Sequence, residues 1–97
     1  MNICLAQVQS IPGNIVANID QHRYWIAKAA EQAADLIIFP ELSLTGYEPT
    51  LAEALAMDPG DTRLAVFQED SQKLGLTIGV GLPTRVAKGI CISLVFF

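Results

Sequence analysis

The chain has 97 residues and a net charge of −4, and 16% of its residues are charged, against roughly 25% in an average soluble domain. Its six basic residues are scattered singly, which provides no electrostatic footprint for nucleic acid or for an anionic membrane. No apolar run reaches the roughly 18 residues of a membrane-spanning helix, and no basic segment precedes the first apolar stretch as it does in a secretory signal. The composition therefore predicts one soluble, core-rich domain in the cytoplasm, with neither nucleic acid nor a membrane as partner.

The first elements expected along the chain are a strand, a helix and a strand. Residues 2–9 alternate like a strand, and residues 15–34 place their apolar side chains on one helical stripe, with Asn14 or Asn18 as the N-cap. Residues 35–40, "DLIIFP", form a short apolar run without alternation, which is typical of a strand covered on both faces. This order is that of an α/β fold.

The second half of the chain continues the same pattern. A short helix is expected over residues 51–57 and a longer one over residues 62–75, with Gly75 at the position of a left-handed C-terminal cap. The runs "LTIGVGLP" and "ICISLVFF" predict two further strands, at residues 76–82 and 90–97, which are joined by the polar turn "TRVAKG".

The last expected strand is strongly apolar, and no charge follows Lys88. An exposed apolar strand invites pairing with another chain. We therefore expect residues 1–97 to be the amino-terminal part of a longer domain, or this strand to be covered by another chain.

The leading candidate for chemistry is Glu41, which follows an apolar strand directly after Pro40. Ligands of open α/β sheets bind at the carboxyl ends of the strands, and a carboxylate held there can act as a general base. Because apolar residues flank it, Glu41 is expected to be mostly buried at the end of the strand over residues 35–39. The alternative is a structural acid that caps a helix or pairs with an arginine.

Three further residues carry weaker signals. Tyr47, in "LTGY", is a candidate substrate-binding residue that lines a pocket near Glu41, although an aromatic residue after a glycine packs against the core as often. Gly79 and Gly81 weaken a strand unless backbone or ligand comes close, so they predict a tight approach at that point.

The remaining reactive side chains favour structural roles. Cys4 and Cys91 lie in apolar strands, where a buried reduced thiol is more common than an ionised nucleophile. His22 lies on the apolar helical stripe without a second ligand at metal-binding spacing, so no metal site is expected. Lys88 is expected to be a solvated lysine in a turn. The turn "SIPGN" matches neither phosphate-binding loop, which argues against a nucleotide-binding domain.

Four segments, taken in order, resemble the amino-terminal part of the nitrilase superfamily, the carbon-nitrogen hydrolases. They are "ICLAQVQ", "PGNIVANI", "ADLIIFPELSLTGY" and "LGLTIGVGLPTR", and the most specific part is "FPEL" with "TGY" shortly after it. The resemblance implies that residues 1–97 form the amino-terminal part of a single domain. Its fold would be the front half of an α-β-β-α sandwich, an α/β arrangement in which helices pack on one face of a mixed sheet.

The resemblance also implies a mechanism. The superfamily uses a Glu, Lys and Cys triad in which the cysteine attacks an amide or nitrile carbon, the glutamate acts as general base and acid, and the lysine stabilises the tetrahedral intermediate. Water then releases a thioester acyl-enzyme, and no metal or cofactor takes part. Glu41 matches the catalytic glutamate of the family. Lys88 and Cys91 match neither remaining member, because the lysine and the cysteine of the family come later in the chain.

Two functions remain open at this point. The first is hydrolysis of a non-peptide C–N bond of a small amide or nitrile by a homo-oligomeric enzyme, of which residues 1–97 carry only the glutamate and are inactive alone. The alternative is a non-catalytic α/β binding or assembly module that keeps the front half of the fold. A lysine and a cysteine at a strand-to-helix elbow, both beyond Phe97, would discriminate between them.

Overall fold

The computed structural model describes residues 1–97, apart from the side chain of Pro49. Over these residues the chain forms an α/β fold in the expected order of strands and helices. The elements are β1 (Ile3–Leu5), α1 (Ile15–Glu31), β2 (Leu36–Ile38), α2 (Pro49–Leu55), the 3-10 helix η1 (Thr62–Leu64), α3 (Ala65–Leu74), β3 (Thr77–Val86) and β4 (Gly89–Phe96).

The ends of the helices follow local chemistry. Asn14 is the N-cap of α1, since its Oδ1 accepts a hydrogen bond from the backbone N–H of Ala17 at 3.1 Å. Gly75 ends α3 with φ 68°, so the expected left-handed cap is confirmed. Helix α1 ends earlier than expected because Ala33 has φ 58°, which no helix continues through.

The ends of the strands follow pairing instead. Strand β1 is shorter than the expected run over residues 2–9, because only Ile3–Leu5 pair with β2 in the sheet. The expectation that the whole segment "TRVAKG" forms a turn is wrong. The ladder between β3 and β4 continues to the pair Val86 and Gly89, so only Ala87 and Lys88 lie between the two strands.

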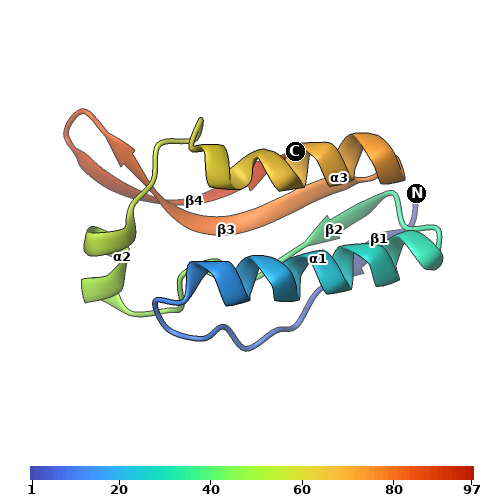
Figure 1. Ribbon diagram of the computed structural model, residues 1–97, viewed down its shortest axis with the longest axis horizontal. Helices are drawn as coiled ribbons and strands as arrows, with labels where there is room; N and C mark the ends of the chain where they lie inside the picture. The colour runs from blue at the N-terminus through green and yellow to red at the C-terminus, as the bar shows by residue number, and fades with distance from the viewer.

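The strands form one mixed sheet in the order β1-β2-β3-β4. Strands β1, β2 and β3 are parallel to their neighbours, whereas β4 is antiparallel to β3. Both parallel connections move in the same direction across the sheet, and right-handed crossovers therefore bring α1 and α3 to the same face. Figure 1 shows these two helices side by side over the sheet. The expected mixed sheet with helices on one face is confirmed.

The core lies between the two long helices and the sheet. Ile26 of α1 and Phe67 of α3 are fully buried, as are Ile37 of β2 and Ile78 and Val80 of β3. No helix in the described part of the chain combines the length and the apolar character that a membrane crossing requires.

An ion pair ties the two helices together at the rim of this core. Arg23 of α1 donates from Nε and Nη2 to the two carboxylate oxygens of Asp70 of α3, at 2.9 and 3.0 Å. Such a bidentate pair fixes geometry as well as adding charge attraction. It holds α1 and α3 against each other.

The opposite face of the sheet carries apolar side chains that nothing in the described chain covers. Ile3 and Leu5 of β1 and Ile92, Leu94 and Phe96 of β4 are between 44% and 75% exposed. Strand β2 is therefore not covered on both faces within this chain, contrary to expectation. Its sequence is apolar on both sides, but the helices cover only one of them.

Candidate active site

Glu41 lies in a turn that spans residues 41–45, just beyond the carboxyl end of β2. Its side chain is exposed, so the expectation that it is mostly buried is wrong. The flanking apolar side chains of Phe39, Leu42 and Leu44 are buried, and they leave the carboxylate on the outside of the turn. Glu41 is therefore held beside the core rather than within it.

The turn lies against strand β3 at a glycine. A Cβ at Gly81 would stand 2.1 Å from the carbonyl oxygen of Pro40 and 2.8 Å from the backbone nitrogen of Leu42. No side chain fits in that space, so the close approach expected at Gly81 is confirmed. At Gly79 the neighbour is the ring of Phe96, 3.0 Å from where a Cβ would be.

Two hydrogen bonds attach the turn to the backbone of Gly81. The N–H of Leu44 donates to the carbonyl of Gly81 at 2.9 Å, and the N–H of Gly81 donates to Oγ of Ser43 at 3.3 Å. Within the turn, Leu42 adopts φ 53°, a left-handed conformation that is a genuine outlier for a bulky residue. Strained backbone of this kind persists only where its surroundings over-determine it, and it gathers at functional sites.

Three hollows of the surface share Glu41 as a lining residue. The first, of about 310 Å³, adds Gln9 and Tyr47, and the second, of about 220 Å³, adds Tyr47 and Ile92. The third, of about 270 Å³, runs along β4 past Gly81 and Ile92. Glu41 therefore borders open space on more than one side.

Tyr47 lies beside the same hollows and is 72% exposed. It does not pack into the core, and the structure brings it together with Glu41 as the sequence predicts. Glu48 lines the same two hollows and was not predicted as a site residue. Its only signal in the sequence is that it directly follows Tyr47.

His22 is fully buried, and its ring packs 4.1 Å from that of Phe39 and 5.8 Å from that of Phe67 between ring centroids. Its Nδ1 lies 2.6 Å from the carbonyl oxygen of Asn18, and its Nε2 lies 2.8 Å from Oγ of Ser43. A carbonyl can only accept, so Nδ1 carries the proton and Nε2 accepts from the Ser43 hydroxyl. Burial lowers the pKa of His22 to about 4, and the imidazole is neutral at pH 7.

This lowered pKa predicts a pH-dependent stability. The folded pKa of about 4 lies below the ordinary histidine value of 6.5, so the unfolded chain binds more protons than the folded one between these two pH values. The free energy of unfolding should therefore be highest above pH 6.5 and fall as the pH drops toward 4, by about 3 kcal/mol in total. Urea unfolding at a series of pH values measures it. The chain has a single histidine, so His22→Gln should lose this fall in the free energy of unfolding. A His22→Gln variant that shows the same fall as the wild type would indicate that another group causes it.

Asn18 holds the other end of the turn. Its side chain is fully buried and donates from Nδ2 to the carbonyl oxygens of Ile11 and Leu44, both at 2.9 Å, while Oδ1 accepts from the N–H of Ile11 at 2.8 Å. The sequence suggested Asn18 only as an alternative N-cap. Its actual partners are distant in the chain, and no local pattern indicates them.

Neither cysteine lies in the hollows around Glu41. Cys4 is half-buried and Cys91 is exposed, both are free, and they lie on β1 and β4, the two edge strands. The expectation of a buried thiol is wrong for Cys91, which is exposed on the edge strand β4. Lys88 is exposed in the hairpin turn, as expected.

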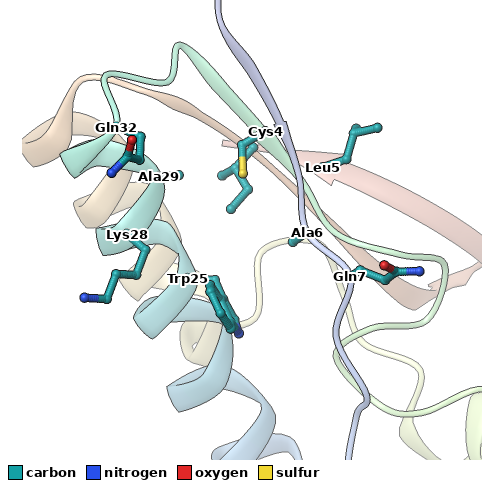
Figure 2. Close-up of a pocket in the computed structure, with 9 residues that line it drawn as sticks. Cys4, Leu5, Ala6, Gln7, Trp25, Lys28, Ala29 and Gln32 are labelled. Carbon is teal, nitrogen blue, oxygen red and sulfur yellow. The ribbon is translucent and has the colours of Figure 1, made fainter.

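A separate groove of about 310 Å³ lies between β1 and α1 and contains both a cysteine and a lysine, Cys4 and Lys28, beside Trp25. Figure 2 shows Cys4 pointing toward the helix and Lys28 extending away from it. The Lys28 ammonium instead lies 3.7 Å from a carboxylate oxygen of Glu31. Because Glu41 does not line this groove, the three residue types do not meet there.

Among the described side chains, no three of His, Cys, Asp and Glu lie close enough together to hold a metal ion. Likewise, no buried polar side-chain atom in this part of the chain lacks a hydrogen-bond partner. The hollows therefore offer the carboxylate of Glu41 on a tightly held turn, with that of Glu48 beside it.

Comparison with known proteins gives one family match. The family model described as "Carbon-nitrogen hydrolase" matches residues 2–97. A search of curated proteins finds no significant match.

Solved structures share the fold. A CN-hydrolase superfamily protein from Xanthomonas campestris, with an arsenic adduct in its active site, matches with a TM-score of 0.81 at 22% identity, over 98% of this chain and 38% of that protein. An amidase from Nesterenkonia sp. matches with a TM-score of 0.73 at 27% identity, over 86% of this chain and 32% of the amidase. A glutamate-to-glutamine variant of the Nesterenkonia sp. AN1 amidase matches with a TM-score of 0.74 at 27% identity, over 86% of this chain and 33% of that variant. In that structure, acrylamide has added to the active-site cysteine. The chain thus spans 38% or less of the length of these proteins.

Proposed function

Because the chain belongs to the carbon-nitrogen hydrolase family, we propose that the protein hydrolyses a non-peptide C–N bond of a small amide, or of a nitrile, with Glu41 as general base. The observation that carries this proposal is an exposed carboxylate on a strained turn at the carboxyl end of β2, bordered by three hollows. Tyr47 lines two of these hollows and is the proposed substrate-binding residue.

The proposed reaction proceeds through a thioester. Glu41 takes the proton of a cysteine thiol, the sulfur attacks the amide carbon, and the C–N bond breaks as Glu41 returns the proton to the leaving ammonia. Water then attacks the thioester and frees the carboxylic acid and the thiol. A lysine stabilises the negative charge of each tetrahedral intermediate, and no cofactor is needed. Amides are favoured over nitriles because the Nesterenkonia proteins are amidases, one of which binds butyramide.

Residues 1–97 alone are proposed to be inactive. Of the triad they supply only Glu41, since neither Cys4 nor Cys91 borders its hollows in the described part of the chain. Without a nucleophile the acyl-enzyme cannot form, and such a loss usually lowers the rate by several orders of magnitude.

The open apolar face of the sheet supports a further part of the proposal. Five large apolar side chains are between 44% and 75% exposed there, and large exposed apolar patches mark interaction surfaces. We propose that this face is covered in the functional protein, which is a cytoplasmic homo-oligomer. The alternative function, a non-catalytic binding or assembly module, would use the same face.

Ammonia release separates the two functions. The full-length protein that carries residues 1–97 is incubated with short aliphatic amides, including butyramide, and with the corresponding nitriles. We expect turnover of at least one amide, and none from residues 1–97 expressed alone. A full-length protein that releases no ammonia from any of them would favour the non-catalytic module, and turnover by residues 1–97 that Cys91→Ala abolishes would show that the nucleophile lies within them.

A further inference from the structure

We propose that His22 is a positioning residue for Glu41, and that it acts through the hydroxyl of Ser43 to hold the turn that carries the carboxylate. This inference rests on the proposed role of Glu41 as general base. His22 lies on α1 and Ser43 lies in the turn, 21 residues further along the chain.

The need for a positioning device comes from the backbone of the turn. Leu42, the residue directly after Glu41, has φ 53°, a conformation that bulky residues rarely adopt. A turn free of other restraints would leave this conformation, and the carboxylate of Glu41 would move with it. General-base catalysis requires the carboxylate to be within hydrogen-bond reach of the proton that it takes. Restraints on the residues beyond Leu42 therefore bear directly on the chemistry.

Ser43 is the point at which these restraints meet. Its Oγ accepts from the N–H of Gly81 at 3.3 Å and donates to Nε2 of His22 at 2.8 Å. Its carbonyl accepts a hydrogen bond from the hydroxyl of Ser10. The residue after Leu42 is thus attached to β3, to α1 and to the segment that follows β1.

The orientation of the His22 ring is fixed from its other side. Nδ1–H donates to the carbonyl of Asn18 at 2.6 Å, and the ring is packed against Phe39 and Phe67. Nε2 is left with a lone pair that points at Ser43, so the direction of the Ser43 hydroxyl is determined as well. The chain of donors runs without a gap from Gly81 through Ser43 and His22 to Asn18.

Two other roles for this pair are less compatible with its surroundings. A serine and a histidine in contact resemble a nucleophile and its base, but Ser43 is only 2% exposed and already accepts from a backbone N–H. A purely structural role would be met by an apolar ring, because α1, β2 and α3 present mostly apolar groups to this position and no charged side chain contributes to the pKa of His22. What a histidine adds at this position is its hydrogen bond to the turn.

The test uses the full-length protein with butyramide as substrate and compares two variants with a matched control. Ser43→Ala removes the bridging hydroxyl, and His22→Phe keeps a ring between Phe39 and Phe67 but neither donates nor accepts. Both should lower kcat by about 10- to 100-fold with KM within about threefold, because a small misplacement of a catalytic group affects the chemical step. The double variant should be no slower than the slower single variant, since both remove the same link. Ile26→Val, which creates a small cavity one helical turn further along α1, should leave kcat unchanged although it lowers the melting temperature.

The outcomes are distinguishable when Glu41→Gln is measured in parallel. If Glu41→Gln is inactive while Ser43→Ala and His22→Phe keep wild-type kcat, His22 is only a packing residue and this inference is overturned, whereas the proposed function stands. If Glu41→Gln keeps wild-type turnover, Glu41 is not the base, and both the proposed function and this inference fail. A fall in kcat that Ile26→Val reproduces at an equal loss of melting temperature would also overturn the inference, because stability alone would then explain it.

Discussion

On the proposed function, replacement of Glu41 by glutamine in the full-length protein is expected to lower kcat for amide hydrolysis by about 10²- to 10⁴-fold, the usual contribution of a general acid–base group. Glutamine keeps the size and polarity of the side chain but cannot take a proton from a thiol or return it to ammonia. The turn should survive the change, because its two hydrogen bonds to Gly81 use the backbone of Leu44 and the hydroxyl of Ser43 rather than the carboxylate. Steady-state ammonia release over a range of substrate concentrations separates kcat from KM.

A matched control for this experiment is Glu53→Gln. Glu53 is an exposed glutamate of α2 that does not border the hollows around Glu41. It undergoes the same loss of charge, so any effect of net charge on the enzyme appears in both variants. A Glu41→Gln enzyme whose kcat stays within tenfold of that of the Glu53→Gln enzyme would contradict the role of Glu41 as base.

Substitution of Gly81 by alanine is expected to destabilise the protein by about 3 kcal/mol, the upper end of the range for overpacking. The new Cβ would stand 2.1 Å from the carbonyl oxygen of Pro40, 2.8 Å from the nitrogen of Leu42 and 3.1 Å from the carbonyl carbon of Glu41. All three neighbours are backbone atoms, so relief requires the whole turn to move away from β3. Urea unfolding measures the loss, and kcat should fall as well because the displaced turn carries Glu41.

Gly79→Ala is the appropriate comparison, since it adds the same methyl group to the same strand two residues earlier. The closest atoms to that Cβ are Cε1 of Phe96 at 3.0 Å and Cδ1 of Leu94 at 3.4 Å, both at the ends of side chains that can rotate. A loss of about 1 kcal/mol is expected there. If the two variants prove equally stable, the contact between the turn and Gly81 is looser than the structure describes.

The order of the elements could be predicted from the sequence because each helix and strand has its own hydrophobic period. The stripe of α1, the apolar runs of β2 to β4 and the glycine after α3 are all local signals. The bounds of the strands could not be predicted in the same way. Pairing with a neighbouring strand decides them, and β3 continues to Val86 because residues of β4 are there to pair with it.

Glu41 could be found from the sequence because its distance from the end of an apolar strand is a property of the chain alone. Its exposure could not, because exposure depends on which side of the turn faces the sheet. That side is set by the contact with Gly81, a residue forty positions further along the chain. Gly79 and Gly81 predicted a close approach, but only the fold shows that the turn of Glu41 approaches Gly81 and the ring of Phe96 approaches Gly79.

By itself the sequence determined the alternation of elements, the acid at the end of a strand and the family motif around it, because these depend on neighbours in the chain. Only the tertiary structure decided that His22, Ser43 and Gly81 form one chain of hydrogen bonds beneath Glu41. The sequence does not distinguish a buried histidine that only packs from one that positions another residue, because its hydrogen-bond partners lie in separate elements. The sequence also does not show which face of the sheet is covered, because its strands are apolar on both sides although helices cover only one face. Coverage depends on how the elements are arranged and not on any segment alone.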